Sequence, residues 1–166
     1  MLGNAQAQSP VDPFDSTFDA LEQDKLTAAL PAPPRDADLV RFELSTDNRN
    51  HHYLDLRSVS FTPIGARFTV VVETPAGLRS SSYIGMSCKS RERRVYAIGR
   101  RDGSWSRSHD SRWRYIEENA YNRQYAALYK EVICGDKPPR DLEQLRTRLR
   151  SAGCALIDTN CGRIRR

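Results

Sequence analysis

The stretch "ARFTVVVETPAGLRSSSYIGMSC", residues 66–88, determines which fold the sequence predicts. As a strand, its first half points Phe68, Val70 and Val72 to one face and the residues between them to the other. The Pro-Ala-Gly that follows is a turn signal, so residues 78–88 are predicted to return antiparallel to the first strand. This hairpin predicts an antiparallel sheet whose second strand ends at a cysteine.

Segments on either side of this hairpin extend the predicted sheet. On the N-terminal side of the hairpin, residues 38–44 and 51–59 alternate between apolar and polar side chains. On the C-terminal side, residues 93–100 alternate again, and Asp102-Gly103 supplies a hairpin turn. We therefore predict an antiparallel meander of about four to six short strands.

The hydrophobic pattern changes to helical spacing after the last predicted strand. Residues 119–133 predict a helix. Its apolar side chains are Tyr121, Tyr125, Leu128, Tyr129 and Val132. Strands followed by helices are typical of an α+β fold, so we expect the helices to pack on one face or edge of the sheet.

A second helix is predicted at about residues 142–151. Asp141 is a suitable N-cap, and Gln144 stands where a capping box places its second member. The apolar stripe of this helix consists of Leu142, Leu145 and Leu149. Gly153 is expected to end the helix.

The chain has 166 residues, 39% of them apolar, which is enough to build one core. We divide it into a proline-rich arm, residues 1–35, an α+β domain, residues 36–136, and a tail with the second helix, residues 137–166. A short helix is expected in the arm, residues 15–29. No run approaches the roughly 20 apolar residues that span a bilayer, so no transmembrane segment is predicted.

Charge is distributed unevenly along the chain. Residues 1–44 contain three basic and eight acidic groups, a net charge of −5. Residues 45–166 contain 23 basic and 13 acidic groups, a net charge of +10. Three interpretations stay open: the acidic arm lies on the basic body, the body binds an anionic partner, or both parts are simply solvated.

The chain has four cysteines, Cys88, Cys134, Cys154 and Cys161, an even count that suits disulfides in an oxidising compartment. Without a C-x-x-C or a paired histidine motif, their spacing does not suit zinc, and we expect neither a metal nor another cofactor. Three pairings are possible, and the most local one joins Cys88 to Cys134 and Cys154 to Cys161. The first bond would fasten the end of a strand to the end of a helix.

Two features invite a catalytic interpretation, and we expect neither to catalyse. Arginines near Cys88 would favour a thiolate, but no histidine stands close in sequence to serve as its base. His109-Asp110 lies among serines, yet neighbouring residues rarely form a base and its orienting carboxylate, and no G-x-S-x-G motif is present. A hydrolase using Cys88 or His109 remains the least favoured alternative.

A basic and aromatic cluster in the second half of the sheet is the candidate ligand surface. It consists of Arg93, Arg94, Tyr96, Arg100, Trp105 and Trp113. Such a surface could bind a polyanion. No nucleic-acid-binding module has this pattern, so nucleic acid is less favoured than an anionic envelope component or another envelope protein.

The first residues, "MLGNAQAQ", bear on the compartment. Ala5-Gln6-Ala7 matches the A-x-A of a signal-peptide cleavage site, but the basic and apolar regions that precede such a site are missing. We interpret this stretch as the end of a signal peptide that has otherwise been removed. The interpretation predicts a periplasmic or cell-envelope protein.

Several blocks of the sequence resemble one family. They are "NRNHHYLDLRSVSF", "SYIGMSCKSRERRVYAIGRRDGSW", "SRWRYI" and "NRQYAALYKEVIC", within residues 30–136. The chain resembles a proteobacterial family named after a cryptic neisserial protein, whose members are largely uncharacterised and usually predicted to be exported. The resemblance implies an extracytoplasmic location and supports the bond between Cys88 and Cys134. It implies no catalytic residue, and it does not reach residues 137–166.

Overall fold

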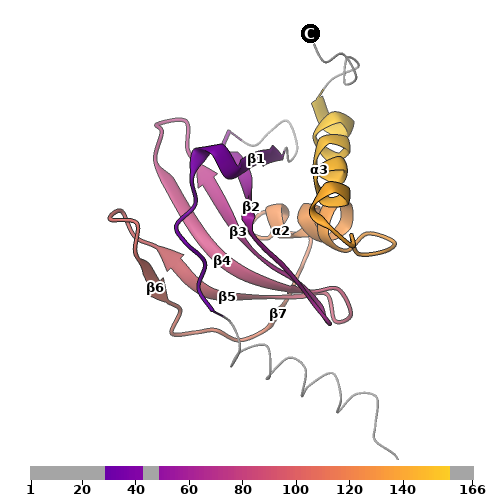
Figure 1. The fold of residues 1–166 in the computed structure, drawn as a ribbon, viewed down its shortest axis with the longest axis horizontal. Helices are drawn as coiled ribbons and strands as arrows, with labels where there is room; N and C mark the ends of the chain where they lie inside the picture. The colour runs from indigo at the N-terminus through magenta and orange to yellow at the C-terminus, as the bar shows by residue number, and fades with distance from the viewer. Residues whose placement is uncertain (1–28, 43–48, 158–166) are drawn as a thin grey trace, which may run out of the picture.

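The computed structural model describes residues 29–42 and 49–157, with side chains described as far as Ala152 (Figure 1). The helix expected from residue 15 onwards falls outside these residues. So do the side chain of Cys154 and the whole of Cys161, so their expected bond stays a prediction.

The strands form one antiparallel sheet in meander order. They are β1 Leu39–Phe42, β2 His51–Thr62, β3 Gly65–Glu73, β4 Arg79–Ser87, β5 Glu92–Gly99, β6 Trp105–Arg107 and β7 Arg114–Tyr115. Strands β1 to β6 neighbour one another in sequence order, and the short β7 pairs with β5 beside β6. The predicted antiparallel meander is confirmed at its upper limit of six strands, with β7 as an addition.

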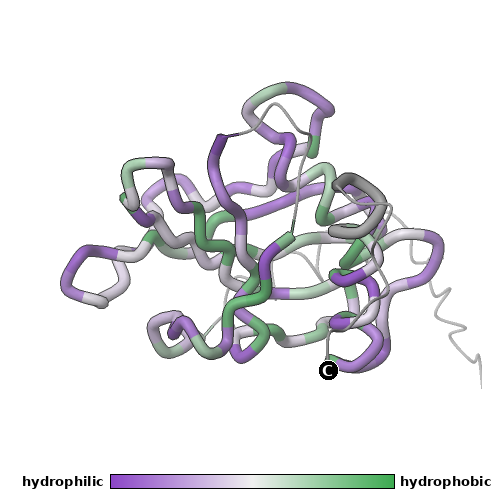
Figure 2. Tube along the Cα trace, turned by 90° about the horizontal axis from the view of Figure 1, so that it is seen from above, coloured by the Kyte–Doolittle hydropathy of each residue, from purple (hydrophilic) through white to green (hydrophobic). Residues whose placement is uncertain are grey.

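Alternation along the strands gives the sheet two different faces. Phe68 pairs with Ile84, and Thr69 pairs with Tyr83, so neighbouring pairs point to opposite sides. The helix face carries Leu54, Phe68, Val70, Ile84 and Met86. The arm face carries Asp55, Thr69, Val71, Tyr83 and Trp105. Hydrophobic segments lie along the strands, whereas the projecting loops are mostly hydrophilic or neutral (Figure 2).

A helical layer covers the helix face. It comprises α2 Arg123–Ala127, the π-helical η2 Leu128–Ile133 and α3 Leu142–Ile157. Leu128, Val132, Leu145 and Leu149 are buried in one cluster with the apolar side chains of the helix face. The α+β fold with helices packed on one face is therefore confirmed.

The first helix differs from its prediction at its N-terminal end. It begins at Arg123, not Asn119, and Tyr121 is 88% exposed instead of facing the core. The Asn119 side chain accepts a hydrogen bond from the Asn122 backbone N–H, at 3.0 Å. Asparagine commonly replaces the first helical turn with a turn of this kind, which explains the later start.

The second helix also departs from its prediction in part. Asp141 Oδ1 accepts the Gln144 N–H at 2.9 Å, as expected of an N-cap, but the Gln144 side chain reaches Arg140 N–H, one residue beyond the capping-box position. Leu142 is 39% exposed and lies outside the buried stripe. The prediction that Gly153 ends the helix is wrong, because α3 continues to Ile157. A glycine weakens a helix by about 1 kcal/mol but does not have to end it.

The described part of the arm, residues 29–35, crosses the arm face of the sheet. Figure 1 shows this indigo segment running over the strands towards β1, while α2 and α3 lie on the other side. It leads into the short 3₁₀ helix η1, Asp36–Asp38. The sheet is thus covered on both faces.

Candidate functional site

An aromatic cluster holds the arm against the sheet. Tyr83 and Tyr96 are buried together, with Leu30 and Trp105 packed against them. The Trp105 indole Nε1–H donates a hydrogen bond to the Pro31 carbonyl at 2.8 Å. Proline-rich segments commonly dock on aromatic surfaces in this way, because an extended chain leaves its carbonyls free to accept.

An ion-pair network holds the far end of the arm. Arg79, at the start of β4, donates hydrogen bonds to the carboxylates of Glu73 and Asp36. These bonds raise the pKa of Arg79 above its ordinary value, at which an arginine is already charged throughout the physiological pH range. Asp36 belongs to η1, so the β3–β4 hairpin and the arm are joined at this point.

A groove of about 430 Å³ lies beside the arm, within the size range of ligand pockets. Its floor includes Val71, Ser81 and Gly99. Its walls come from the arm, the β3–β4 hairpin and the β5–β6 hairpin, and include Pro33, Pro34, Leu78, Arg100, Arg101 and Trp105. A Cβ atom on Gly99 would lie 2.0 Å from Ser81 Oγ, so a larger residue here would require the Ser81 side chain to turn away.

The β5–β6 hairpin carries its arginines on a well-ordered turn. Gly103 has φ +83°, a left-handed conformation that favours glycine. Asp102 Oδ1 accepts hydrogen bonds from Ser104 N–H and Oγ–H, at 2.9 and 2.7 Å, and these lower the pKa of Asp102. Arg100 donates to Ser106 Oγ at 3.3 Å. The turn therefore places Arg100 and Arg101 at the end of the hairpin, with the Arg100 guanidinium directed to the side of Ser106, which is opposite to Trp105.

Arg94 lies inside the molecule, only 2% exposed. Its Nε–H donates to Ser111 Oγ at 2.8 Å, and its guanidinium lies 5.5 Å from the Tyr96 ring and 6.0 Å from the Trp113 ring. Gly85 opposite leaves room for Tyr96, since a Cβ there would lie 2.7 Å from the tyrosine Oη. In this group Arg94 and Tyr96 are buried, whereas Trp113 is partly exposed.

The six residues of the predicted ligand surface fall into three places. Arg94, Tyr96 and Trp113 lie together in one group, whereas Arg100 and Trp105 line the groove. Arg93 points to the helix face, where its guanidinium lies 4.2 Å from the Tyr125 ring and donates to Asn122. Neighbouring strand residues point to opposite faces, so Arg93 and Arg94 cannot share one surface.

Sequence reasoning missed several groove residues, namely Arg79, Ser81, Arg101 and the arm prolines. The arm and the two hairpins meet only in three dimensions, and no local pattern reports that meeting. One signal was available: Arg100 and Arg101 directly precede the Asp-Gly turn, which places two cations at a hairpin tip.

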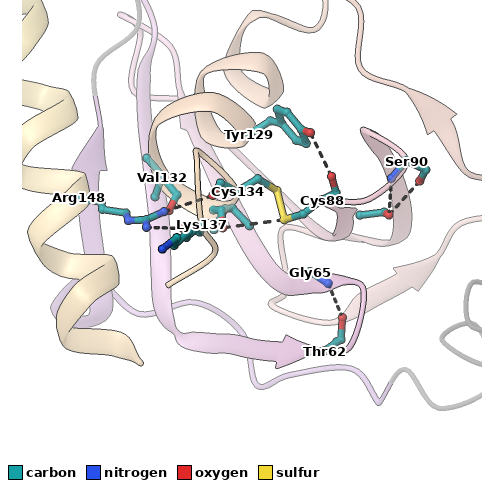
Figure 3. Close-up of a disulfide and its surroundings, with 11 residues drawn as sticks. Thr62, Gly65, Cys88, Ser90, Tyr129, Val132, Cys134, Lys137 and Arg148 are labelled. Atoms are coloured by element: carbon teal, nitrogen blue, oxygen red, sulfur yellow. Dashed lines mark hydrogen bonds between the residues drawn. A yellow bond between two sulfur atoms is a disulfide. The ribbon is translucent and has the colours of Figure 1, made fainter. Parts of the chain in front are cut away.

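The predicted bond between Cys88 and Cys134 is present, with an Sγ–Sγ distance of 2.01 Å (Figure 3). It joins the end of β4 to the end of η2, as expected from the sequence. Tyr129 Oη–H also donates to the Cys88 carbonyl at 3.1 Å. From α3, the Arg148 guanidinium donates to the carbonyls of Cys134 and Lys137. The disulfide therefore lies where sheet, η2 and α3 meet.

The structure describes both residues on which a hydrolase would depend, Cys88 and His109. Cys88 Sγ is bonded to Cys134 and so is not a free thiol in this structure. Asp110 accepts hydrogen bonds from Arg112 and Arg114, which hold its pKa below the ordinary value. His109 is exposed beside it. Among the described residues, no group of three or more histidine, cysteine, aspartate or glutamate side chains could hold a metal ion.

A family model described as the CNP1-like family matches residues 20–150. The chain belongs to the CNP1-like family. The match extends on both sides of the region that carried the resemblance, and it takes in the arm that crosses the sheet and the first half of α3. Neither a curated protein nor a solved structure matches the chain.

No helix in the part of the chain that the structure describes is long and apolar enough to cross a membrane.

Proposed function

We propose that this member of the CNP1-like family is an exported, non-catalytic binding module of the cell envelope. The Cys88–Cys134 disulfide carries the proposal, because disulfides persist in oxidising compartments and are rare in the cytosol. The groove beside the arm supports a binding role, since it is framed by the arm and two hairpins and lined by both apolar and charged residues.

Cell fractionation combined with thiol labelling tests the location. The protein is expressed from its native gene, cells are separated into periplasmic and cytoplasmic fractions, and thiols are alkylated before and after reduction. We expect the protein in the periplasmic fraction, with Cys88 and Cys134 alkylated only after reduction. Recovery from the cytoplasm with both residues alkylated in the folded protein would contradict the proposal.

The disulfide should also raise the free energy of unfolding of the protein. The bond closes a loop spanning a sequence separation of 46 residues, and the chain-entropy model assigns about 4 kcal/mol to a loop of that size. We therefore expect the double variant Cys88→Ser/Cys134→Ser to unfold at lower urea, with a free energy of unfolding lower by about 2–5 kcal/mol. Reductant should lower the stability of the wild type by a similar amount and have a smaller effect on the double variant, which keeps only Cys154 and Cys161. A wild type indifferent to reductant would show that the bond does not support the fold.

A further inference from the structure

The arm lies on the sheet without being part of the hydrophobic core. Residues 29–35 belong to no strand, and none of residues 29–38 is fully buried. The core itself lies on the other side of the sheet, between the helix face and the helical layer. Segments with few buried contacts open at a low cost in free energy, so the arm can leave the sheet while the core stays folded.

The arm presents positions three residues apart to the sheet. Pro31 and Pro34 are half-buried, whereas Ala32 and Pro33 between them are exposed. A polyproline helix has three residues per turn, so it brings positions with this spacing to the same surface. The arm therefore meets the sheet in the way that a proline-rich ligand meets its receptor.

Aromatic side chains supply the receptor surface for this segment. The Tyr83 ring lies 5.6 Å from the Tyr96 ring and 6.4 Å from the Trp105 ring, centroid to centroid. Leu30 packs against this cluster, and the Trp105 indole N–H donates to the Pro31 carbonyl at 2.8 Å. An aromatic groove of this kind is the common feature of domains that recognise proline-rich peptides.

A charged contact fixes the register of the docked segment. Asp36, two residues after Pro34, accepts a hydrogen bond from Arg79. Arg79 also donates to Glu73 at the end of β3, so its guanidinium keeps a partner when Asp36 leaves. The surface thus favours a carboxylate at one fixed distance from the prolines.

Space remains beside the docked prolines. The groove of about 430 Å³ is lined by Pro33, Pro34 and the two hairpins, so the arm does not fill the site. A segment with larger side chains at these two positions would bury more of the groove wall at Leu78 and Trp105, and would bind more tightly for that reason.

We propose that the arm face is a docking site for an extended proline-rich segment of a partner protein, and that the arm is its internal occupant. The segment has an apolar residue before a proline, a second proline three residues later and a carboxylate two residues beyond it, as the arm has from Leu30 to Asp36. A tethered occupant competes at an effective concentration on the order of millimolar, so it excludes weak partners and yields to tighter ones. The inference rests on the proposed binding role and names the class of partner.

Calorimetric titration of the full chain with synthetic peptides tests this inference. The probe has the sequence of residues 29–38, and its control has all three prolines replaced by alanine. In the variant Leu30→Ser/Asp36→Ser the arm loses its apolar contact and its ion pair, while every residue of the receptor surface is kept. We expect this variant to bind the probe at least about tenfold more tightly than the wild type does, because its own arm no longer competes. The alanine peptide should bind at least about tenfold more weakly than the probe.

Single changes in the receptor surface locate the bound peptide. In the arm variant, Trp105→Phe and Arg79→Gln should each weaken binding of the probe about threefold to tenfold, since the first removes the indole donor and the second removes the partner of the carboxylate. Tyr121→Phe and Arg146→Gln, similar changes outside the groove, should each alter it less than about twofold. Asp36→Asn alone keeps Leu30 in place and should bind the probe with an intermediate affinity, so the inference can be tested even if the double variant folds poorly.

Three results would overturn the inference. Equal binding to the wild type and to the arm variants would place the peptide elsewhere on the molecule. No binding by the arm variants at millimolar peptide, or equal binding of the alanine peptide, would exclude a proline-rich ligand. If sedimentation shows a dimer of the full chain that Leu30→Ser/Asp36→Ser abolishes, the arm of a second copy is the occupant in place of a partner protein. None of these results affects export or the disulfide, which fractionation and thiol labelling test separately.

Discussion

Asp55 is an acidic residue that is buried on the arm face of the sheet. Its carboxyl group is 2% exposed, on the same side of the sheet as its partner Thr69. Burial raises its pKa, although the hydrogen bond from Arg57 N–H, at 3.0 Å, opposes the rise. No arginine or lysine among the described residues lies within ion-pair distance of this carboxylate. The ionised form is therefore less favourable in the folded chain than in the unfolded one.

This carboxyl group should make stability depend on pH. Because the folded pKa is raised, the folded state keeps its proton to a higher pH than the unfolded state, whose pKa is near 3.8. Stability contributed by the protonated form is present below 3.8 and is lost as pH rises through the folded pKa. We expect Asp55→Asn, whose amide oxygen can still accept the Arg57 N–H, to be more stable than wild type at pH 7. The gain should vanish below 3.8.

Urea unfolding of both proteins across that pH range measures the effect. Asp38, whose charge also raises the pKa of Asp55, provides the comparison: Asp38→Asn should shift the transition to lower pH without removing it. A stability difference between Asp55→Asn and wild type that stays constant with pH would show that Asp55 does not titrate in this way.

At the scale of elements, local patterns predicted the sheet and misplaced the helix ends. The strands β3 and β4 were predictable because alternation and a turn signal are both local, and the register Phe68 to Ile84 follows from them. Helix ends depend on competition between nearby groups. Asn119 diverts the chain into a turn before α2, and α3 passes through Gly153. Neither outcome is encoded in hydrophobic spacing.

The buried stripe of α3 gives a test of how this helix docks. Leu149 is buried against the helix face, whereas Leu142 is half exposed at the first turn. Leu149→Ala should lower the free energy of unfolding by about 2–5 kcal/mol, because it removes buried contacts and leaves a cavity. Leu142→Ala should lower it by less than about 1 kcal/mol. Chemical denaturation measures both, and equal effects would mean that α3 does not dock as described.

At the scale of the whole molecule, the groove exists only because distant segments meet. The arm reaches β6 through Pro31 and Trp105, and it reaches β4 through Asp36 and Arg79. These contacts join residues separated by 74 and 43 positions in sequence. Sequence patterns report neighbours within an element, so they identified the basic and aromatic residue types but not which of them would share a surface. The predicted surface was accordingly divided, with Arg93 on one face and Trp105 on the other.

Removing the hydrogen bond between Trp105 and the Pro31 carbonyl should loosen the whole arm, residues 30–38. Trp105→Phe keeps most of the apolar ring but loses the Nε1–H that binds the Pro31 carbonyl, so we expect a loss of about 1 kcal/mol of stability. Hydrogen exchange should speed up in residues 30–38 while β3 and β4 keep their protection, because the helix face does not depend on this bond. Tyr121→Phe, an exposed aromatic change away from the arm, should leave exchange unchanged. If exchange in residues 30–38 is unaltered in Trp105→Phe, other contacts hold the arm. If exchange accelerates equally across the sheet, the arm does not open separately from the core.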